Sequence, residues 1–115
     1  MQYKVVKDYT DTPEKPIIIT KGEQLKVIEE SDAHGDWPNW IFCRGEDKKG
    51  WVPKQILIIE SDIATVQKDY QAIEHRLSVG ELLVAEFELN GWIWCAKSSD
   101  KDAMGWSPLN HLERV

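Results

Sequence analysis

The sequence predicts an all-β protein made of two small β-barrels in tandem. Three observations lead to this fold class: four sequence blocks recur in the same order in both halves, apolar side chains alternate over short stretches, and turn-forming residues separate those stretches. A chain of 115 residues is long enough for two barrels of about 55–60 residues each. We therefore expect barrel 1 at residues 1–60 and barrel 2 at residues 61–115.

The repeat is carried by four blocks in each half. They are a Lys-Asp-Tyr triplet, a Gly-Glu pair ahead of an apolar alternation, a Trp-Ile-x-Cys segment and a Gly-Trp-x-Pro segment. Because the spacing of corresponding blocks changes only where loops are expected, chance does not account for their order. The blocks occupy residues 7–9, 22–27, 40–43 and 50–53 in the first half and residues 68–70, 80–85, 92–95 and 105–108 in the second.

The blocks predict short strands. In the first Trp-Ile-x-Cys segment, Ile41 and Cys43 share one face, and Trp40 and Phe42 share the other. Residues 81–89 carry a short helical period, but the matching segment of the first half alternates like a strand, so we expect a strand there as well. Turn residues cluster between the blocks, at residues 10–16, 31–38, 45–49 and 97–102.

The connection between the two predicted barrels is short. Residues 58–63 contain neither Gly nor Pro, the residues that give linkers their flexibility or turns. We therefore expect the two barrels to be held in a fixed arrangement.

The charge and the hydropathy of the chain exclude several classes of partner. The formal net charge is −6, and both halves are negative, so a nucleic-acid backbone or an anionic membrane surface would be repelled. The longest apolar runs are far too short to span a bilayer, and the first residues contain no apolar stretch of the kind found in signal peptides. We expect a cytoplasmic protein that binds neither nucleic acid nor membrane.

The ordered blocks resemble the Src-homology-3 (SH3) domain, in the variant form found in bacterial proteins. That family opens with Ala-Leu-Tyr-Asp-Tyr, continues through Gly-Asp-x-Leu-x-Val and Trp-Trp-x-Ala-Arg, and closes with Gly-x-x-Pro-x-x-Tyr. The resemblance implies two SH3-like barrels with a binding role and no catalytic one. The corresponding segments are residues 5–9, 22–27, 40–44 and 50–53, and then residues 66–70, 80–85, 92–96 and 105–108.

Both halves depart from the family where it holds proline-rich ligands. Lys7 and Lys68 replace the first tyrosine of the opening motif, and Ile56 and His111 replace the final tyrosine. In the family those tyrosines help form the grooves that bind a polyproline II helix. We therefore expect a ligand other than a standard PxxP peptide.

The resemblance also implies which residues face the ligand. Tyrosine, tryptophan and proline positions of both halves correspond to the aromatic groove, and acidic residues of the first long loop correspond to those that pair with Arg or Lys of a ligand. A basic protein or peptide is the natural complement. The predicted groove residues are Tyr9, Asp11, Glu14, Trp40, Pro53, Tyr70, Glu74, Trp92, Trp94 and Pro108.

The tryptophans have a second interpretation. Trp92 and Trp94 lie two positions apart on the outer face of their strand and form an apolar stripe. Either a partner covers this stripe, a second copy in a homodimer included, or the other barrel does. In the first half, Trp37 competes with Trp40 for the groove position.

The cysteines and histidines do not indicate catalysis or metal binding. Cys43 and Cys95 occupy the small core position of each barrel, so we expect both thiols to be buried, reduced and unable to reach each other. The three histidines show no metal-ligand spacing. We predict no catalytic residue, no metal site and no cofactor.

The leading hypothesis is a non-catalytic module that binds a protein or peptide. One alternative is a Tudor- or Agenet-like protein, in which Tyr9, Trp37 and Trp40 form an aromatic cage for a methylated or basic residue. The other alternative, a small Cys-dependent enzyme, requires an accessible thiol beside a base.

Overall fold

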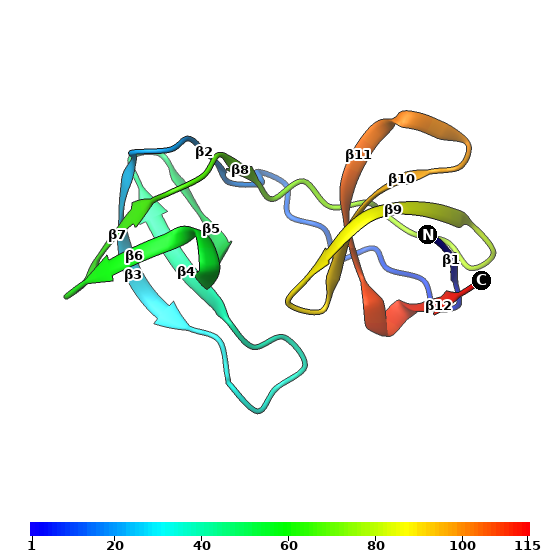
Figure 1. The fold of residues 1–115 in the computed structure, drawn as a ribbon, viewed down its shortest axis with the longest axis horizontal. Coiled ribbons are helices and arrows are strands. Elements are labelled where there is room, and N and C mark those ends of the chain that lie inside the picture. The colour runs from blue at the N-terminus through cyan, green and yellow to red at the C-terminus, as the bar shows by residue number, and fades with distance from the viewer. The chain divides into compact units, whose positions relative to one another are not determined.

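The computed structural model describes all 115 residues. Its regular elements are strands β1–β12 and two short 3-10 helices, η1 and η2 (Figure 1). The predicted all-β fold class is confirmed, and no helix is long and apolar enough to cross a membrane. The strands form two compact units. Unit 1 combines Met1–Glu14 with Ile73–Val115, and unit 2 is the continuous segment Lys15–Ala72.

Unit 2 is a barrel closed within one stretch of chain. A five-stranded sheet has the order β5-β4-β3-β7-β6, and β2 pairs with β8 in a separate ladder. Its core is formed by apolar side chains from both ladders, among them Ile17, Ile19, Leu25, Ile41 and Val52. The elements are β2 (Ile18–Ile19), β3 (Gln24–Glu30), β4 (Trp40–Gly45), β5 (Lys48–Pro53), η1 (Lys54–Ile56), β6 (Leu57–Glu60), β7 (Ile63–Val66) and β8 (Tyr70–Gln71).

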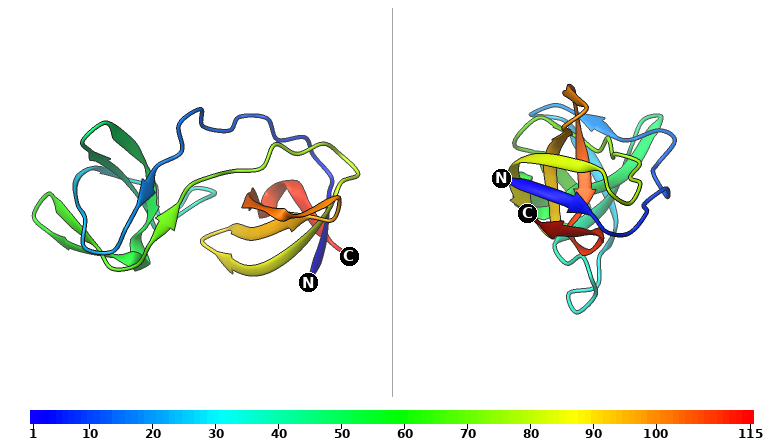
Figure 2. Two further views of the ribbon diagram at one scale, coloured as in Figure 1. Left: turned by 90° about the horizontal axis from the view of Figure 1, so that it is seen from above. Right: turned by 90° about the vertical axis from the view of Figure 1, so that its right-hand side faces the viewer.

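Unit 1 has the same architecture but draws its strands from both ends of the chain. Its sheet has the order β11-β10-β9-β1-β12, so the N-terminal strand lies between two C-terminal ones (Figures 1 and 2). The core contains Tyr3, Val5, Leu77, Leu83 and Ile93. The elements are β1 (Gln2–Val5), β9 (Leu82–Leu89), β10 (Trp92–Lys97), β11 (Asp100–Pro108), η2 (Leu109–His111) and β12 (Leu112–Arg114).

The two halves of the sequence have exchanged their first strands. β1 pairs with β9 and β12, with Tyr3 opposite Leu83, whereas β7 pairs with β3 and β6, with Ala64 opposite Leu25. β1 and β7 are the corresponding strands of the repeat, as are β3 and β9. Each barrel therefore receives its first strand from the other half, in the same register.

The aspartate of each Lys-Asp-Tyr triplet stabilises the strand exchange through a hydrogen bond. The N–H of Val79 donates to Asp8 Oδ1 at 2.8 Å, and the N–H of Lys21 donates to Asp69 Oδ1 at 2.8 Å. Both hydrogen bonds join an aspartate of one sequence half to the turn before the Gly-Glu pair of the other half. This role explains why the aspartate recurs in both halves.

The predicted boundaries of 1–60 and 61–115 therefore differ from the units of the structure. Residues 58–63, expected to connect two barrels, instead contain the turn of the β6–β7 hairpin, where Ser61 has a φ of 57°. The physical reason is that β1 and β7 are similar enough to pair with either sheet, so the order of blocks does not reveal which strand completes which barrel. Chain order alone predicts that β1 pairs with β3 and β6, whereas in the structure β7 pairs with them.

The glycines of the repeat have two separate roles. Gly22 and Gly80 have φ values of 97° and 96°, in the left-handed region that favours glycine, and they start the turns into β3 and β9. Gly50 and Gly105 allow a neighbouring segment to approach the sheet closely. In unit 2 that neighbour is Ile17, and in unit 1 it is the ring of His75.

Gly50→Ala is expected to lower the free energy of unfolding of unit 2 by about 1–3 kcal/mol, because overpacking in a filled core is costly. A Cβ at this position would lie 2.8 Å from Ile17 Cγ2, and Ile17 is only 2% exposed. Urea denaturation measures the change. Gly35→Ala is the control, since its Cβ would meet nothing closer than 3.4 Å. Equal losses in the two variants would contradict the packing argument.

Candidate binding groove

Tyr9 is the centre of an aromatic cluster in unit 1. Its ring lies edge-on to Trp92, with ring centroids 5.8 Å apart, and edge-on to His111 at 5.2 Å. Backbone hydrogen bonds between Tyr9 and Leu77 fix the position of the tyrosine. A segment from the first half of the sequence thus meets the tryptophan and the terminal helix η2 of the second half.

A carboxyl group lies at the edge of this cluster. The Tyr9 hydroxyl donates to Glu74 Oε1 at 2.5 Å and is 3.2 Å from the backbone oxygen of Asp11. Glu74 forms no ion pair with any Lys, Arg or His side chain. The cluster therefore presents a negative group that has a neutral donor for a partner and no cation.

The environment shifts the acidity of all three groups. Burial raises the pKa of Glu74, and the charge of Asp11 adds to this rise, while the hydrogen bond from Tyr9 opposes it. Burial and the adjacent Glu74 raise the pKa of Tyr9, so its hydroxyl remains a donor. Burial and the charge of Lys7 lower the pKa of His111. The tyrosine and the imidazole are thus both neutral at pH 7.

The Trp and Pro positions of the two units correspond. Trp92 pairs across the hairpin with Pro108, and Trp40 pairs with Pro53, so Trp40 and not Trp37 is the counterpart of Trp92. Trp40 is 7% exposed and Trp92 is 8% exposed, and both prolines are fully buried. Each proline therefore lies across the hairpin from its tryptophan and offers no surface of its own.

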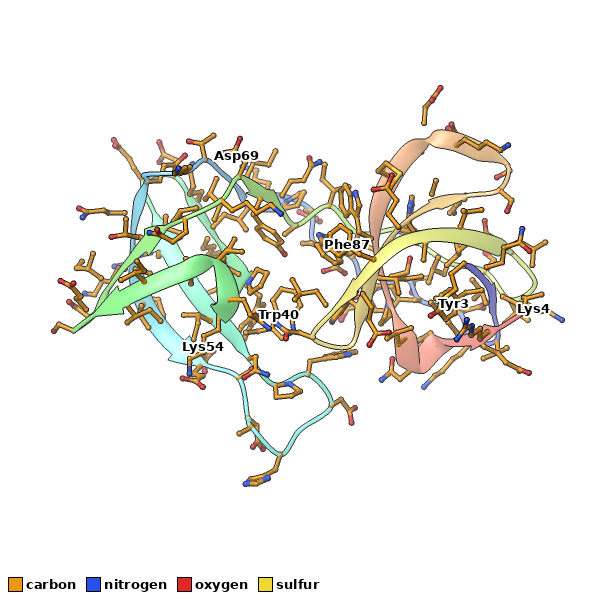
Figure 3. All side chains as sticks on the ribbon, in the orientation of Figure 1. Tyr3, Lys4, Trp40, Lys54, Asp69 and Phe87 are labelled. Carbon is orange, nitrogen blue, oxygen red and sulfur yellow. The ribbon has the colours of Figure 1, made fainter.

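A second aromatic cluster lies on the outer face of the β10–β11 hairpin. Trp94 pairs across the hairpin with Trp106 at a centroid distance of 5.2 Å, and Phe87 stands edge-on to Trp106 at 5.6 Å. Phe87 is labelled in Figure 3 and is 49% exposed. Unit 2 repeats the arrangement with Phe42 and Trp51, 5.2 Å apart. Trp106 was not among the predicted groove residues. The signal for it was that the Trp-Ile-x-Cys and Gly-Trp-x-Pro blocks pair as a hairpin, which sets Trp106 opposite Trp94.

The structure regroups the predicted groove residues. Tyr9, Glu74, Trp92 and Pro108 fall in unit 1, together with Asp11, Glu14 and Trp94, whereas Trp40, Pro53 and Tyr70 fall in unit 2. The predicted boundaries instead put Tyr9 in the same barrel as Trp40, and Tyr70 in the same barrel as Trp92. The assignment of barrels is corrected by the strand exchange. The groove role of these residues stays a prediction.

The acidic residues of the first loop differ in what they touch. Asp11 and Glu14 are exposed, and only the backbone oxygen of Asp11 approaches Tyr9. Glu74, by contrast, is half-buried against the tyrosine. The predicted homodimer through an open Trp92–Trp94 stripe loses part of its basis, because Trp92 is buried and Trp94 packs on Trp106.

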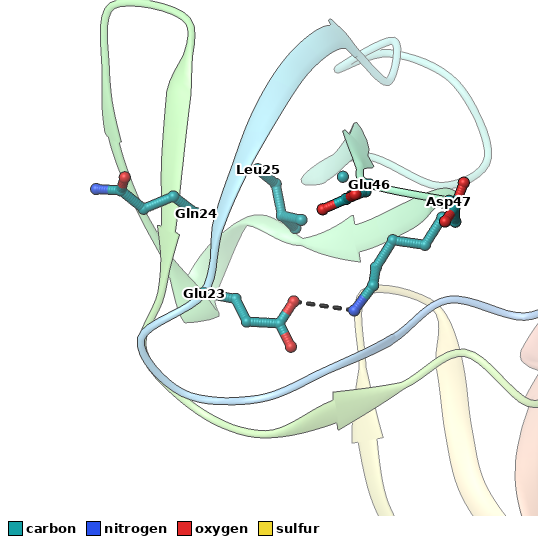
Figure 4. Close-up of a pocket in the computed structure, with 7 residues that line it drawn as sticks. Glu23, Gln24, Leu25, Glu46 and Asp47 are labelled. Carbon is teal, nitrogen blue, oxygen red and sulfur yellow. Dashed lines mark hydrogen bonds and ion pairs between the residues drawn. The ribbon is translucent and has the colours of Figure 1, made fainter.

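A polar depression of about 480 Å³ lies beside the β4–β5 hairpin of unit 2 (Figure 4). Lys48 Nζ crosses it to Glu23 Oε2 at 3.0 Å and also donates to the backbone oxygen of Ile18. In unit 1, Lys97 makes the same pair of contacts, to Glu81 and to the backbone oxygen of Arg76. The hydrogen bond from Lys48 lowers the pKa of Glu23. Because the contacts recur in both units, we interpret them as structural. In unit 2 they hold the segment before β3 against the β4–β5 hairpin, and in unit 1 they hold the segment before β9 against the β10–β11 hairpin.

The cysteines lie inside the two barrels. Cys43 and Cys95 are free and 0% exposed, and burial raises the pKa of Cys43 to about 11. The Cys95 thiol donates to Ser107 Oγ at 3.4 Å, and its pKa is also raised by burial. His75 Nε2 is bonded to the backbone oxygen of Cys95 and not to the thiol. No group of three His, Cys, Asp or Glu side chains is arranged to hold a metal ion.

The two five-stranded units define a class of small β-barrel domains, each with a tryptophan paired across a hairpin with a buried proline. Within that class, the profile of the variant SH3 domain matches residues 2–60, and the chain belongs to this family. The resemblance noted from the sequence is thereby confirmed. The match follows chain order across β1–β6, whereas in space β1 belongs to unit 1. No solved structure matches the chain.

Proposed function

We propose that this protein is a non-catalytic module that binds a protein or peptide through the Tyr9–Trp92 groove of unit 1. The observation that carries the proposal is the half-buried Glu74 carboxyl group, which touches Tyr9 and has no cationic partner. A ligand that presents Lys or Arg would supply the missing charge beside an aromatic ring. The expected ligand is therefore a basic segment.

The composition of the groove argues against an ordinary PxxP ligand. Lys7 and His111 stand where the family has tyrosines, and His111 packs its ring edge-on against Tyr9. A polyproline helix needs successive aromatic ridges to hold its prolines. Because two of these ridges are replaced, the aromatic surface that could pack against prolines is smaller, while the Glu74 carboxyl group remains. We therefore expect a ligand to be chosen by its positive charge more than by its prolines.

The alternatives have weaker support. The cage of Tyr9, Trp37 and Trp40 draws on residues of both units, since Tyr9 belongs to unit 1 and the two tryptophans to unit 2. A Cys-dependent enzyme would rely on thiols that are fully buried and not paired with a base. The groove roles of Tyr70, Trp40 and Pro53 stay predictions, and these three residues all belong to unit 2.

Titration of the ¹⁵N-labelled chain with three peptides of equal length tests the proposal. One peptide contains Arg and Lys without PxxP, one contains PxxP without basic residues, and one is acidic. We expect the basic peptide alone to shift the amide signals of Tyr9, Glu74 and His111 and the indole signal of Trp92. Equal shifts of these signals by the uncharged PxxP peptide, or shifts by none of the three, would reject the proposal.

A further inference from the structure

The exchanged strands differ most at one buried position. Tyr3 of β1 and Ala64 of β7 occupy corresponding places, opposite Leu83 and Leu25, and they are 8% and 0% exposed. A tyrosine thus fills in unit 1 the place that an alanine fills in unit 2. Figure 3 labels Tyr3 and the neighbouring Lys4 on β1.

The two cores compensate for this difference in volume. In unit 2, Val27 and the fully buried Val52 accompany Ala64. At the corresponding positions of unit 1, Ala85 and the fully buried Ser107 accompany Tyr3. The large Tyr3 thus shares its core with small side chains, and the small Ala64 shares its core with larger ones.

We infer that this match of side-chain volumes selects the strand-exchanged topology, with Tyr3 and Ala64 as the selecting pair. Without exchange, Tyr3 would enter the core that holds Val27 and Val52, and Ala64 would leave a void beside Ala85. Overpacking and cavities both destabilise a core. Backbone pairing does not distinguish the two topologies, because the registers correspond, so the side chains must.

The selection also determines which tyrosine reaches which tryptophan. β1 carries Tyr9 into unit 1, where its ring packs on Trp92. Tyr3 is therefore a positioning residue for the groove, and this consequence rests on the proposed function. The topology itself can be tested without any ligand, so failure of one proposal is distinguishable from failure of the other.

Disulfide trapping in the full-length chain distinguishes the two topologies. Lys4 lies opposite Leu82 in the structure, and both are exposed. Gln24 is the residue of β3 that corresponds to Leu82, and it pairs with Thr65. A Lys4→Cys, Leu82→Cys chain should therefore form a disulfide within one chain under mild oxidation, whereas Lys4→Cys with Gln24→Cys should not. The buried Cys43 and Cys95 stay in place in both.

Exchanging the selecting pair should reverse this result. With Tyr3→Ala and Ala64→Tyr added to both, we expect the Lys4→Cys, Gln24→Cys chain to form its disulfide in high yield and the Lys4→Cys, Leu82→Cys chain to form little of its own. Tyr3→Phe, which keeps the volume, should leave the wild-type result unchanged. Peptide mapping by mass spectrometry and non-reducing electrophoresis identify the products.

Three outcomes would overturn the inference. They are a major 4–24 disulfide in the otherwise wild-type chain, a product linked mainly between two chains, and a 4–82 disulfide that persists in a folded double variant. Circular dichroism reports whether that variant folds. If it does not, Tyr3→Ala alone decides, because removal of the large side chain should raise the 4–24 product from undetectable to a yield similar to that of 4–82. An unchanged 4–82 preference would then reject the inference.

Discussion

Ile41→Ala in unit 2 and Ile93→Ala in unit 1 are each expected to destabilise both units, with the larger loss in the unit that carries the substitution. The two isoleucines occupy corresponding positions in β4 and β10, and each is 1% exposed. Truncation of a buried isoleucine to alanine costs about 2–5 kcal/mol. The local losses should therefore be similar, and a smaller loss should appear in the other unit of each variant.

The coupling between the two units follows from their connectivity, and as a free energy between two folding events it acts equally in both directions. Unit 2 is one continuous segment, and the β2–β8 ladder and a hydrogen bond from Ala72 N–H to the Ile17 oxygen hold its two ends together. Unit 1 is built from Met1–Glu14 and Ile73–Val115, which the whole of unit 2 separates along the chain. A folded unit 2 thus closes the loop that unit 1 needs. An unfolded unit 2 leaves that closure to be made, at a cost of about 3–4 kcal/mol for a loop of this length.

Native-state hydrogen exchange measures both units in each variant. The slowest amides of β9 and β10 report on unit 1, and those of β3 and β4 report on unit 2. In both variants both sets should lose protection, and the set in the mutated unit should lose more. Loss of protection confined to the mutated unit in both variants would contradict the argument.

The fold class followed from the sequence because local physics determines the strands. The alternation of Ile41 and Cys43 against Trp40 and Phe42, and the turns at the glycines of the two Gly-Glu pairs, depend only on neighbours along the chain. The tight turn at Asp47, with a φ of 58°, ends β4 where turn residues were expected. Such features are legible without knowledge of the partner strand.

The partner of each first strand could not be predicted in the same way. The aspartates Asp8 and Asp69 make the same hydrogen bond to corresponding turns, so they fit either topology. The volume relation between Tyr3 and Ala64 becomes visible only when the core neighbours are known. Repetition of the blocks made the fold predictable and, for the same reason, left the pairing of halves open.

The candidate site was predicted in part for a related reason. Tyr9, Glu74 and Trp92 were each named from the family resemblance, but they were divided between two barrels. Their convergence depends on the strand exchange, and so does the contact of Tyr9 with His111. From the sequence, His111 was identified only as a residue that replaces the family's final tyrosine. In the structure it is a neutral ring that supports Tyr9.

Glu74→Gln is expected to weaken binding of the Arg- and Lys-containing peptide about tenfold or more, because a hydrogen bond to a charged group contributes about 1.5–3 kcal/mol. The same variant should be at least as stable as the wild type at pH 7. A glutamine keeps an oxygen that can accept the hydrogen bond from Tyr9, and it removes a carboxylate that is half-buried without a cation. Loss of function with no loss of stability is the pattern expected of a ligand-binding residue.

The pH dependence gives the sign of the stability change. Burial raises the pKa of Glu74 in the folded chain above its ordinary value of 4.5, so ionisation favours the unfolded chain. The wild type should therefore lose stability relative to Glu74→Gln as pH rises from 4.5 through the folded pKa, and the two should converge below pH 4.5. Other carboxyl groups, such as Glu23, are common to both proteins and cancel in the difference.

Glu86→Gln is the matched control, because Glu86 is exposed in the same unit and is not one of the predicted groove residues. It removes the same charge from the chain, so any effect of net charge on a basic peptide appears in both variants. Urea denaturation at pH 4 and pH 7, with peptide titration at pH 7, should show a pH-dependent difference and weakened binding for Glu74→Gln only. A Glu74→Gln chain that binds as well as Glu86→Gln would place the ligand elsewhere. A chain that is less stable than wild type at pH 7 would instead make the Tyr9–Glu74 contact structural.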